Sequence, residues 1–223
     1  MECEMTLEWA SIDTPVGPVS VACGAAGVAE VRFGTRPEGG ISVLGSGGTG
    51  SGPDGGSPDR SRPDGGSPDA GSPDRSSPGE NRPDGSAPGH AVLAARRQLA
   101  EYFSGQRQEF DLPIDWSGFG PAQRQVLGRL HADVGYGETV TYGTLADRAG
   151  IPAGPDVIPA RAVGQIMGSN PIPVIVPCHR VVASDGLGGY SGGAGPEVKR
   201  WLLILEGSLP PTLDWVPARP LAD

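Results

Sequence analysis

The sequence predicts a protein of the mixed α+β class, and three observations support this prediction. The first 35 residues carry apolar and β-branched runs separated by glycine-containing turns, which is typical of short antiparallel strands. From residue 91 onward, apolar residues recur at helical spacing in several segments. Between these parts lies a low-complexity tract, residues 45–90, in which 36 of 46 residues are Gly, Ser, Pro or Asp. The tract divides the chain into an early strand-rich part and a later helix-rich part.

The strand-rich part contains three predicted strands. Residues 19–22 and 28–33 are expected to form a β-hairpin around the loop 23–27. An earlier strand at about residues 7–12 is expected to end at the turn 13–17, which contains proline and glycine. These strands form the first part of an N-terminal domain, residues 1–44.

The low-complexity tract repeats proline at every fifth position from Pro53 to Pro88, with almost nothing apolar between the prolines. Such a segment buries too little apolar surface to offset the entropy lost on ordering. We therefore expect residues 45–90 to be an inserted, disordered linker. His90, at its edge, is expected to be exposed and not a metal ligand.

Five helices are predicted after the tract. Residues 91–116 complete the N-terminal domain with a helix that ends near Gly105 and an extended segment at 110–114. Residues 117–209 form a C-terminal domain, followed by a tail, 210–223. Its helices are expected around Val126–Val134, at Tyr142–Ala149 with Thr141 as N-cap and Gly150 at the stop, at Ala160–Met167, and at Pro196–Glu206. The Tyr142 and Ala160 helices are compatible with a helix-turn-helix, although their turn, 151–159, is long.

The charge and the hydropathy of the sequence exclude some classes of function. The formal net charge of −9 argues against a protein that binds nucleic acid over its whole surface. Residues 119–209, however, carry seven basic and seven acidic side chains, so a local basic face remains open. No apolar run is long enough for a membrane span, and the acidic start at Met1–Glu4 is unlike a signal peptide. We expect a soluble, cytoplasmic protein.

The cysteines direct attention to one thiol. Cys3, Cys23 and Cys178 are widely spaced, which supports neither a disulfide framework nor a zinc ribbon. Cys178 follows a buried apolar run and precedes His179 and Arg180, surroundings that lower the pKa of a thiol. A reactive cysteine and an inert buried cysteine beside a surface histidine are both compatible with this pattern. A thiol hydrolase suits it less, because adjacent Cys and His do not give the geometry of a triad.

The segment Pro177-Cys178-His179-Arg180-Val181, preceded by Asn170-Pro171, resembles the active-site signature of the O6-alkylguanine-DNA alkyltransferases, the methylated-DNA-protein-cysteine methyltransferases of DNA repair. Further matching motifs follow in the same order, at residues 124–127, 137–142, 161–164, 190–193 and 199–203. The resemblance is strong from about Phe119 to Gly207. It implies a ribonuclease H-like N-terminal domain with a small antiparallel sheet, and a C-terminal domain of the winged-helix or helix-turn-helix type.

The resemblance also implies a reaction. The Cys178 thiolate attacks the alkyl carbon on O6 of guanine in DNA, and the resulting thioether leaves each molecule with one turnover and no cofactor. His179 acts as a base through a water, because neighbouring side chains point in different directions, and Glu206 orients the imidazole. Asn170 links the nucleophile turn to the helix pair. From the residues alone, the alternative interpretations are a solvated charge at a helix end for Glu206 and a turn-forming residue for Asn170.

The same resemblance places several residues at the DNA. To reach a base in a duplex, the protein has to flip the nucleotide out. Arg161 is expected to fill the gap, Tyr142 to rotate the phosphate and line the base pocket, and Ser191 to donate a backbone N–H to O6. Val181 is expected to offer main-chain contacts to guanine. Tyr190 and Arg180 complete the predicted substrate- and DNA-binding residues. A surface salt bridge for Arg161 and a core position for Tyr142 are the alternatives.

The expected partner is duplex DNA that contains O6-alkylguanine, bound through the minor groove by a monomer. The alternative is a protein that binds alkylated DNA without transferring the alkyl group, and Cys178 argues against it, because such relatives replace the nucleophile. Two departures from the family stand out: Ala122 replaces a common Phe, and the turn 151–159 is longer than usual. Cys3 and Cys23 resemble two of four zinc ligands in the animal branch, but Ala29 stands where a His is needed. We therefore expect no metal.

Overall fold

A computed structural model describes residues 7–35, 41–42, 89–155, 157–193 and 195–211. Residues 1–44 and 87–223 cluster into one compact unit, which contains both of the predicted domains. Nearly all of the tract that was predicted to be disordered, residues 45–88, lies outside the described residues. Cys3 and most of the predicted tail also lie outside them. Within the described part, the mixed α+β class with a small antiparallel sheet is confirmed.

The sheet has four strands in the order β3-β2-β1-β4. β1 (Glu8–Ile12), β2 (Val19–Gly24) and β3 (Gly27–Phe33) are antiparallel neighbours, as the hairpin prediction required. The two-residue strand β4 (Ile41–Ser42) was not predicted, and it pairs in parallel with β1.

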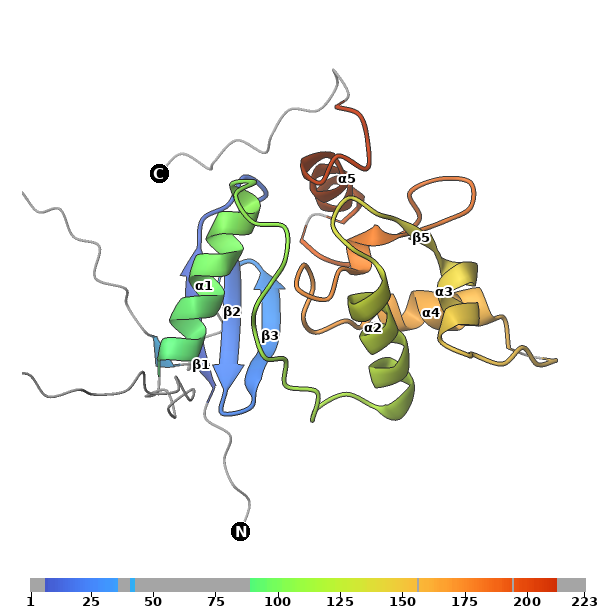
Figure 1. Cartoon of the computed structure of the whole chain (residues 1–223), viewed down its shortest axis with the longest axis horizontal. Helices are drawn as coiled ribbons and strands as arrows, with labels where there is room; N and C mark the ends of the chain where they lie inside the picture. Colours follow the sequence, from blue (N-terminus) through green and yellow to red (C-terminus); the bar gives the residue numbers. More distant parts are fainter. Residues whose placement is uncertain (1–6, 36–40, 43–88, 156, 194, 212–223) are drawn as a thin grey trace, which may run out of the picture. The chain divides into compact units, whose positions relative to one another are not determined.

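Helix α1 (His90–Phe103) covers one face of this sheet (Figure 1). It begins one residue before the predicted start, and exposed His90 lies in its first turn. The backbone N–H of Gly89, which adopts a left-handed φ of 100°, donates to the Glu8 carboxylate at 2.5 Å. This bond ties the start of α1 to β1. The helix buries the apolar stripe that predicted it, namely Val92, Ala95, Leu99, Tyr102 and Phe103.

The outer edge of β3 connects the sheet to the rest of the compact unit. The predicted extended segment 110–114 lies along it, and the Val28 N–H donates to the Pro113 carbonyl at 2.8 Å. Gly27 has a φ of 128°, and a side chain there would collide with the Pro113 backbone. Further along, the Val31 N–H donates to the Pro171 carbonyl at 2.9 Å. A strand edge thus holds the beginning of the segment that carries Cys178.

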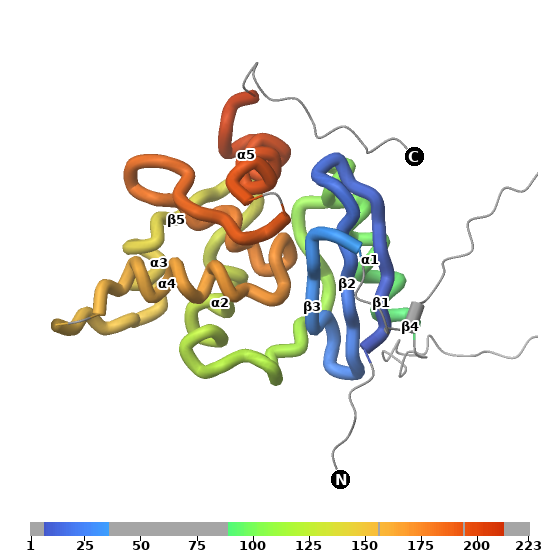
Figure 2. Tube along the Cα trace, turned by 180° about the vertical axis from the view of Figure 1, so that it is seen from behind, coloured from blue at the N-terminus to red at the C-terminus, as the bar shows by residue number. Residues whose placement is uncertain are grey.

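Four further helices confirm the predictions for the C-terminal part. They are α2 (Pro121–Asp133), α3 (Tyr142–Arg148), α4 (Pro159–Gly168) and α5 (Pro196–Leu205). The Thr141 hydroxyl accepts a hydrogen bond from the Thr144 N–H, as expected for the N-cap of α3. α3 and α4 pack against each other, and Figure 2 shows the segment that joins them.

A two-stranded parallel ladder completes the fold. It pairs β5 (Val140–Thr141), directly before α3, with β6 (Val181–Val182), directly after the nucleophile turn. Cys178 is thereby fixed close to the helix pair. Among the described helices, none combines the length and the apolar character that crossing a membrane requires.

Candidate active site

The segment that delivers Cys178 is a buried loop, residues 171–177, which ends in a 3₁₀ turn, η1 (Cys178–Arg180). Asn170, just after α4, closes this loop with its side chain. Its amide nitrogen donates to the Val176 carbonyl at 2.9 Å, and its amide oxygen accepts from the Ile172 N–H at 3.1 Å. Val174 adopts a φ of 75°, which is costly for a β-branched residue. The loop is therefore held in shape by specific contacts, with Asn170 as the predicted link between α4 and the thiol.

Burial raises the pKa of the Cys178 thiol above its ordinary value, because the side chain is only 4% exposed. Hydrogen bonding by Asn170 and Tyr190 and the charge of Lys199 act in the opposite direction without cancelling this effect. The predicted lowering of the thiol pKa by its chain neighbours His179 and Arg180 is wrong. The side chains of both neighbours are bound to Glu206 instead.

Glu206, at the end of α5, is the centre of a buried hydrogen-bond network. Its Oε1 atom lies 2.9 Å from His179 Nε2. Arg180 binds the same carboxylate with two nitrogens, Nε to Oε2 and Nη2 to Oε1, each at 2.9 Å. The structure thus brings together the predicted pair His179 and Glu206. It places Arg180 in this network, with a side chain only 8% exposed, and not on a surface that DNA could contact.

The protonation states of the network follow from these contacts. Burial alone would raise the pKa of Glu206, but His179 and Arg180 outweigh it and bring the pKa to about 2. Burial lowers the pKa of His179, so its imidazole is neutral near pH 7. Because a carboxylate only accepts hydrogen bonds, the proton of His179 has to sit on Nε2. Its Nδ1 atom is buried and has no hydrogen-bond partner among the described residues, which leaves a basic lone pair.

Tyr102 is a member of the network that the sequence analysis missed. Its hydroxyl donates to Glu206 Oε1 at 2.6 Å, and the ring is fully buried on the core face of α1. Burial and the nearby carboxylate raise the pKa of Tyr102 well above its ordinary value, so the hydroxyl stays protonated as a donor. The sequence pattern showed only an aromatic residue on an apolar helix face.

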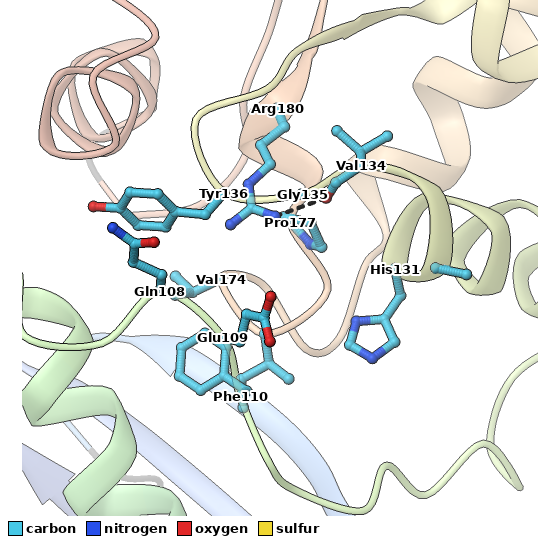
Figure 3. Close-up of a pocket in the computed structure, with 12 residues that line it drawn as sticks. Gln108, Glu109, Phe110, His131, Val134, Gly135, Tyr136, Val174, Pro177 and Arg180 are labelled. Atoms are coloured by element: carbon cyan, nitrogen blue, oxygen red, sulfur yellow. Dashed lines mark hydrogen bonds between the residues drawn. The ribbon is translucent and has the colours of Figure 1, made fainter.

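Arg180 also connects the network to the end of α2. Its Nη1 atom donates to the Val134 carbonyl at 2.8 Å, a contact that Figure 3 draws as a dashed line. A cavity of about 270 Å³ lies against this guanidinium. It is lined by residues 108–110, the last turn of α2 and the residues that follow it, and the loop before Cys178. Glu206 and Val134 together satisfy Arg180 on three of its nitrogens.

Lys199 is the second residue that the sequence analysis missed as part of the site. This side chain of α5 is fully buried, and its ammonium donates to the carbonyls of Val181, Leu187 and Gly189, the first at 2.7 Å and the last at 3.2 Å. Burial lowers the pKa of Lys199 to about 8. The motif match at 199–203 included this position but did not indicate that the side chain points inward.

A second cavity, of about 460 Å³, opens onto Cys178. Helices α3 and α4 line one side of it with Tyr142, Ala160, Gly164 and Met167. Cys178 of η1 and the loop after β6, with Gly189, Tyr190 and Ser191, complete the lining. The Tyr142 hydroxyl donates to the Gly189 carbonyl at 3.2 Å. Gly188 has a φ of 69°, and a side chain there would touch the Tyr142 ring. The volume and the mostly apolar lining suit a flat heteroaromatic group.

Of the predicted DNA-contacting residues, Tyr142, Tyr190 and Ser191 line this second cavity, whereas Arg161, Val181 and Arg180 do not. Arg161 is exposed in the first turn of α4 and has no ion-pair partner among the described residues, so the predicted alternative of a salt bridge is not seen there. The Ser191 hydroxyl donates to the Gly168 carbonyl at 3.0 Å. The Tyr190 hydroxyl is buried beside the thiol. Val181 is buried, its N–H bound to Cys178 and its carbonyl to Lys199.

No group of His, Cys, Asp or Glu side chains within the described residues is arranged to hold a metal ion. Cys23 is buried on β2, and burial together with Glu8 raises the pKa of its thiol to about 12. This thiol is therefore protonated near neutral pH, which makes it a poor nucleophile.

Comparison with known proteins identifies the relatives of this chain. Residues 121–208 match the family described as "6-O-methylguanine DNA methyltransferase, DNA binding domain". A methylated-DNA--protein-cysteine methyltransferase of Mycobacterium bovis is 45% identical over 122 residues, 54% of this chain and 68% of the relative. The mouse protein of the same name is 54% identical over 84 residues, which is 38% of this chain and 37% of the relative.

A third relative, a DNA base-flipping protein of Thermus thermophilus, is 40% identical over 125 residues, 55% of this chain and 78% of that protein. Among solved structures, the Mycobacterium tuberculosis OGT in complex with DNA is similar, with a TM-score of 0.60 and 32% identity. That likeness covers 90% of this chain and 93% of the other. With this coverage and identity, the chain belongs to the O6-methylguanine-DNA methyltransferase family, the methylated-DNA-protein-cysteine methyltransferases.

Proposed function

We propose that Cys178 accepts an alkyl group from O6 of guanine in duplex DNA, once per molecule. The chain belongs to a family of DNA-repair methyltransferases, and the proposal concerns which of its residues carry out the reaction. One observation carries this assignment: Cys178 lines a cavity of about 460 Å³, and the next residue, His179, is hydrogen-bonded to buried Glu206. The alternative of binding without transfer needs neither the thiol nor the relay.

The reaction forms a bond from Cys178 sulfur to the alkyl carbon and breaks the bond from that carbon to O6. The thiol proton passes to His179 Nδ1 through a water, and the departing guanine takes up a proton in return. His179 can act as this base because Glu206 holds the proton of Nε2 and stabilises the imidazolium that forms. Because the product is a thioether, a second turnover is not expected.

Because the pKa of Cys178 is raised, the thiol needs a base such as His179 to remove its proton. A thiol with a raised pKa is almost entirely protonated near pH 7, so the nucleophile has to be made within the site. The ammonium of Lys199 stabilises the thiolate through its charge, and Asn170 through a hydrogen bond. Ser191, which lines the cavity, offers its N–H to O6 as charge develops there.

For the DNA, we propose that α3 and α4 act as a helix-turn-helix of winged-helix type, and that the sheet with α1 corresponds to a ribonuclease H-like domain. The α4 helix enters the minor groove, exposed Arg161 takes the place of the flipped nucleotide, and Tyr142 lines the cavity that receives the base. Val181 offers main-chain contacts to the base, and Tyr190 closes the cavity beside the thiol. The protein acts as a monomer, without a cofactor, in the cytoplasm.

The test is the intact mass of the protein after incubation with a duplex that carries O6-methylguanine, followed by peptide mapping. We expect a gain of one methylene on the peptide with Cys178, at one equivalent per protein. Cys178→Ala should bind the duplex and gain nothing, and Cys23→Ser is the matched control that should react normally. Binding without a mass gain in the unaltered protein would instead support a damage-binding protein.

A further inference from the structure

The segment between α3 and α4 carries two exposed apolar side chains. Val157 is 46% exposed and Ile158 is 56% exposed, and among the described residues these are the only exposed large apolar side chains. They lie in the turn 151–159, which joins α3 to α4. An exposed apolar pair at the surface suggests contact with another molecule.

The backbone around the pair has a defined conformation. Gly154 and Val157 exchange two backbone hydrogen bonds, with N–O distances of 3.2 and 3.3 Å. The Ile158 carbonyl accepts from the N–H of Arg161 at 2.9 Å, which starts α4. Prolines at 152, 155 and 159 restrict the segment further. Figures 1 and 2 both show it projecting beyond the helix pair.

Ile158 is also unusual for its place in the helix. It is the N-cap residue of α4, and its side chain makes no capping bond. Ser, Thr, Asp and Asn stabilise this position, whereas an exposed isoleucine neither caps the helix nor avoids water. A residue that departs from a local preference without a gain in packing often serves a function.

The pair adjoins the candidate base cavity. Ala160, two residues after Ile158, lines that cavity together with Cys178. Arg161 follows, exposed in the first turn of α4. Any duplex that delivers a base to Cys178 therefore has to approach this end of α4. Apolar side chains at such places enter the minor groove and partly unstack base steps, which lowers the cost of flipping a nucleotide.

We propose that Val157 and Ile158 form an apolar wedge that enters the minor groove beside the flipped nucleotide. This proposal rests on the proposed function and extends its DNA-binding surface beyond the helix pair. The wedge contacts sugars and base edges, so it adds affinity without adding charge. Its contribution should therefore be visible at all salt concentrations.

The test is the double variant Val157→Ser/Ile158→Ser with two substrates: a duplex containing O6-methylguanine, and O6-methylguanine as the free base. The free base enters the cavity without a groove. We expect about tenfold weaker duplex binding and correspondingly slower transfer below saturation. Transfer from the free base should not change. The slope of log Kd against log salt should also be unchanged, because no charge is lost. Ala153→Ser, exposed on the same segment, is the matched control.

Three results would overturn the wedge: duplex binding equal to that of the unaltered protein, an equal slowing with the free base, or a change in sedimentation without a change in DNA binding. The second would indicate a role in local folding, and the third a contact between copies of the chain. Failure of the unaltered protein to react with either substrate would count against the proposed function. The duplex-binding comparison would still decide the wedge in that case.

Discussion

The carboxylate of Glu206 accepts a hydrogen bond from the His179 imidazole at 2.9 Å, and both side chains are fully buried although they lie 27 positions apart in the chain. The same carboxylate neutralises Arg180. A single side chain thus orients the proposed base and balances a buried cation, which links the rate of alkyl transfer to the stability of the fold.

Replacing Glu206 should therefore affect both properties. Glu206→Gln leaves Arg180 as a buried charge without a counterion, which should lower the free energy of unfolding by about 3–5 kcal/mol. Loss of the imidazole's partner should slow alkyl transfer by about 100-fold. Urea denaturation and single-turnover rates measure the two effects. Glu197→Gln, exposed in the first turn of α5, is the control, and an E206Q protein that matched it in both assays would refute the relay.

Removing the Tyr102 hydroxyl should reduce stability and the rate of alkyl transfer less than replacing Glu206 does. Tyr102→Phe removes one of the donors to Glu206 but leaves His179 and Arg180 in place, so we expect a loss of about 1–2 kcal/mol in the free energy of unfolding. The alkyl-transfer rate should fall by much less than in E206Q. Tyr136→Phe removes a hydroxyl bond to the Leu205 carbonyl, outside the relay, and should leave the rate unchanged. A larger rate loss in Y102F than in E206Q would show that the tyrosine acts on the thiol directly.

Lys199 should act through charge and through loop position. Lys199→Met removes the ammonium that stabilises the thiolate and holds three carbonyls, so transfer from the free base should slow and its pH optimum should rise. In the unaltered protein, deprotonation of Lys199 with a pKa of about 8 should give a falling limb on the alkaline side of the pH profile. That limb should be absent from K199M. Arg200→Met on the same helix is the control, and an unchanged profile in K199M would assign the lysine to folding alone.

Acid should destabilise the protein in two stages. His179 is neutral in the fold because burial lowers its pKa, so stability is fully present above its unfolded pKa of about 6.5 and falls as the pH decreases below it. Glu206 has a folded pKa of about 2 against an ordinary 4.5, so its contribution is lost as the pH falls from 4.5 towards 2. Urea midpoints measured across this range should decrease in both windows. In E206Q the decrease in the lower window should be smaller, because Asp115 also has a lowered pKa and still contributes there.

Removal of the low-complexity tract should leave the reaction intact. Because Gly89 and His90 belong to the start of α1, the deletion should cover 45–86 and not 45–90. These residues carry four arginines and seven acidic side chains, a net charge of −3. Their loss should leave transfer from the free base unchanged and strengthen duplex binding at low salt. Weaker binding, or a lower unfolding midpoint, would assign the tract a role in the folded protein.

The sequence was informative where a pattern is local. Apolar periodicity, together with the Thr141 N-cap in the case of α3, predicted the five described α-helices, because helices such as α1 and α2 bury one stripe of their own residues. The 3₁₀ turn η1 was not predicted. The pair His179 and Glu206 came from the family resemblance. Its geometry agrees with the roles assigned to it, which await the rate measurements above.

Long-range contacts were harder to predict. Tyr102 meets Glu206 across 104 residues, and nothing near it in the chain marks it as a hydrogen-bond donor to the relay. Lys199 lies beside the apolar stripe of α5, where a lysine is ordinarily solvated. Arg180 was expected at the DNA from the family resemblance, and its burial depends on the position of α5. The direction of the Cys178 pKa was wrong for the same reason, since chain neighbours are not spatial neighbours.

The Glu206 network joins α1, the residue that caps the end of α2, the nucleophile turn and the residue that caps the end of α5. Its members are therefore separated by much of the chain, and the relay can form only after the helix that comes last has docked. Contacts of such high sequence separation form slowly and late in folding. A fragment that stops before Glu206 can contain the thiol, the cavity lining and both helices of the DNA-binding pair, yet lack the base that activates the thiol. In a refolding experiment, recovery of alkyl transfer should consequently lag behind recovery of helical signal.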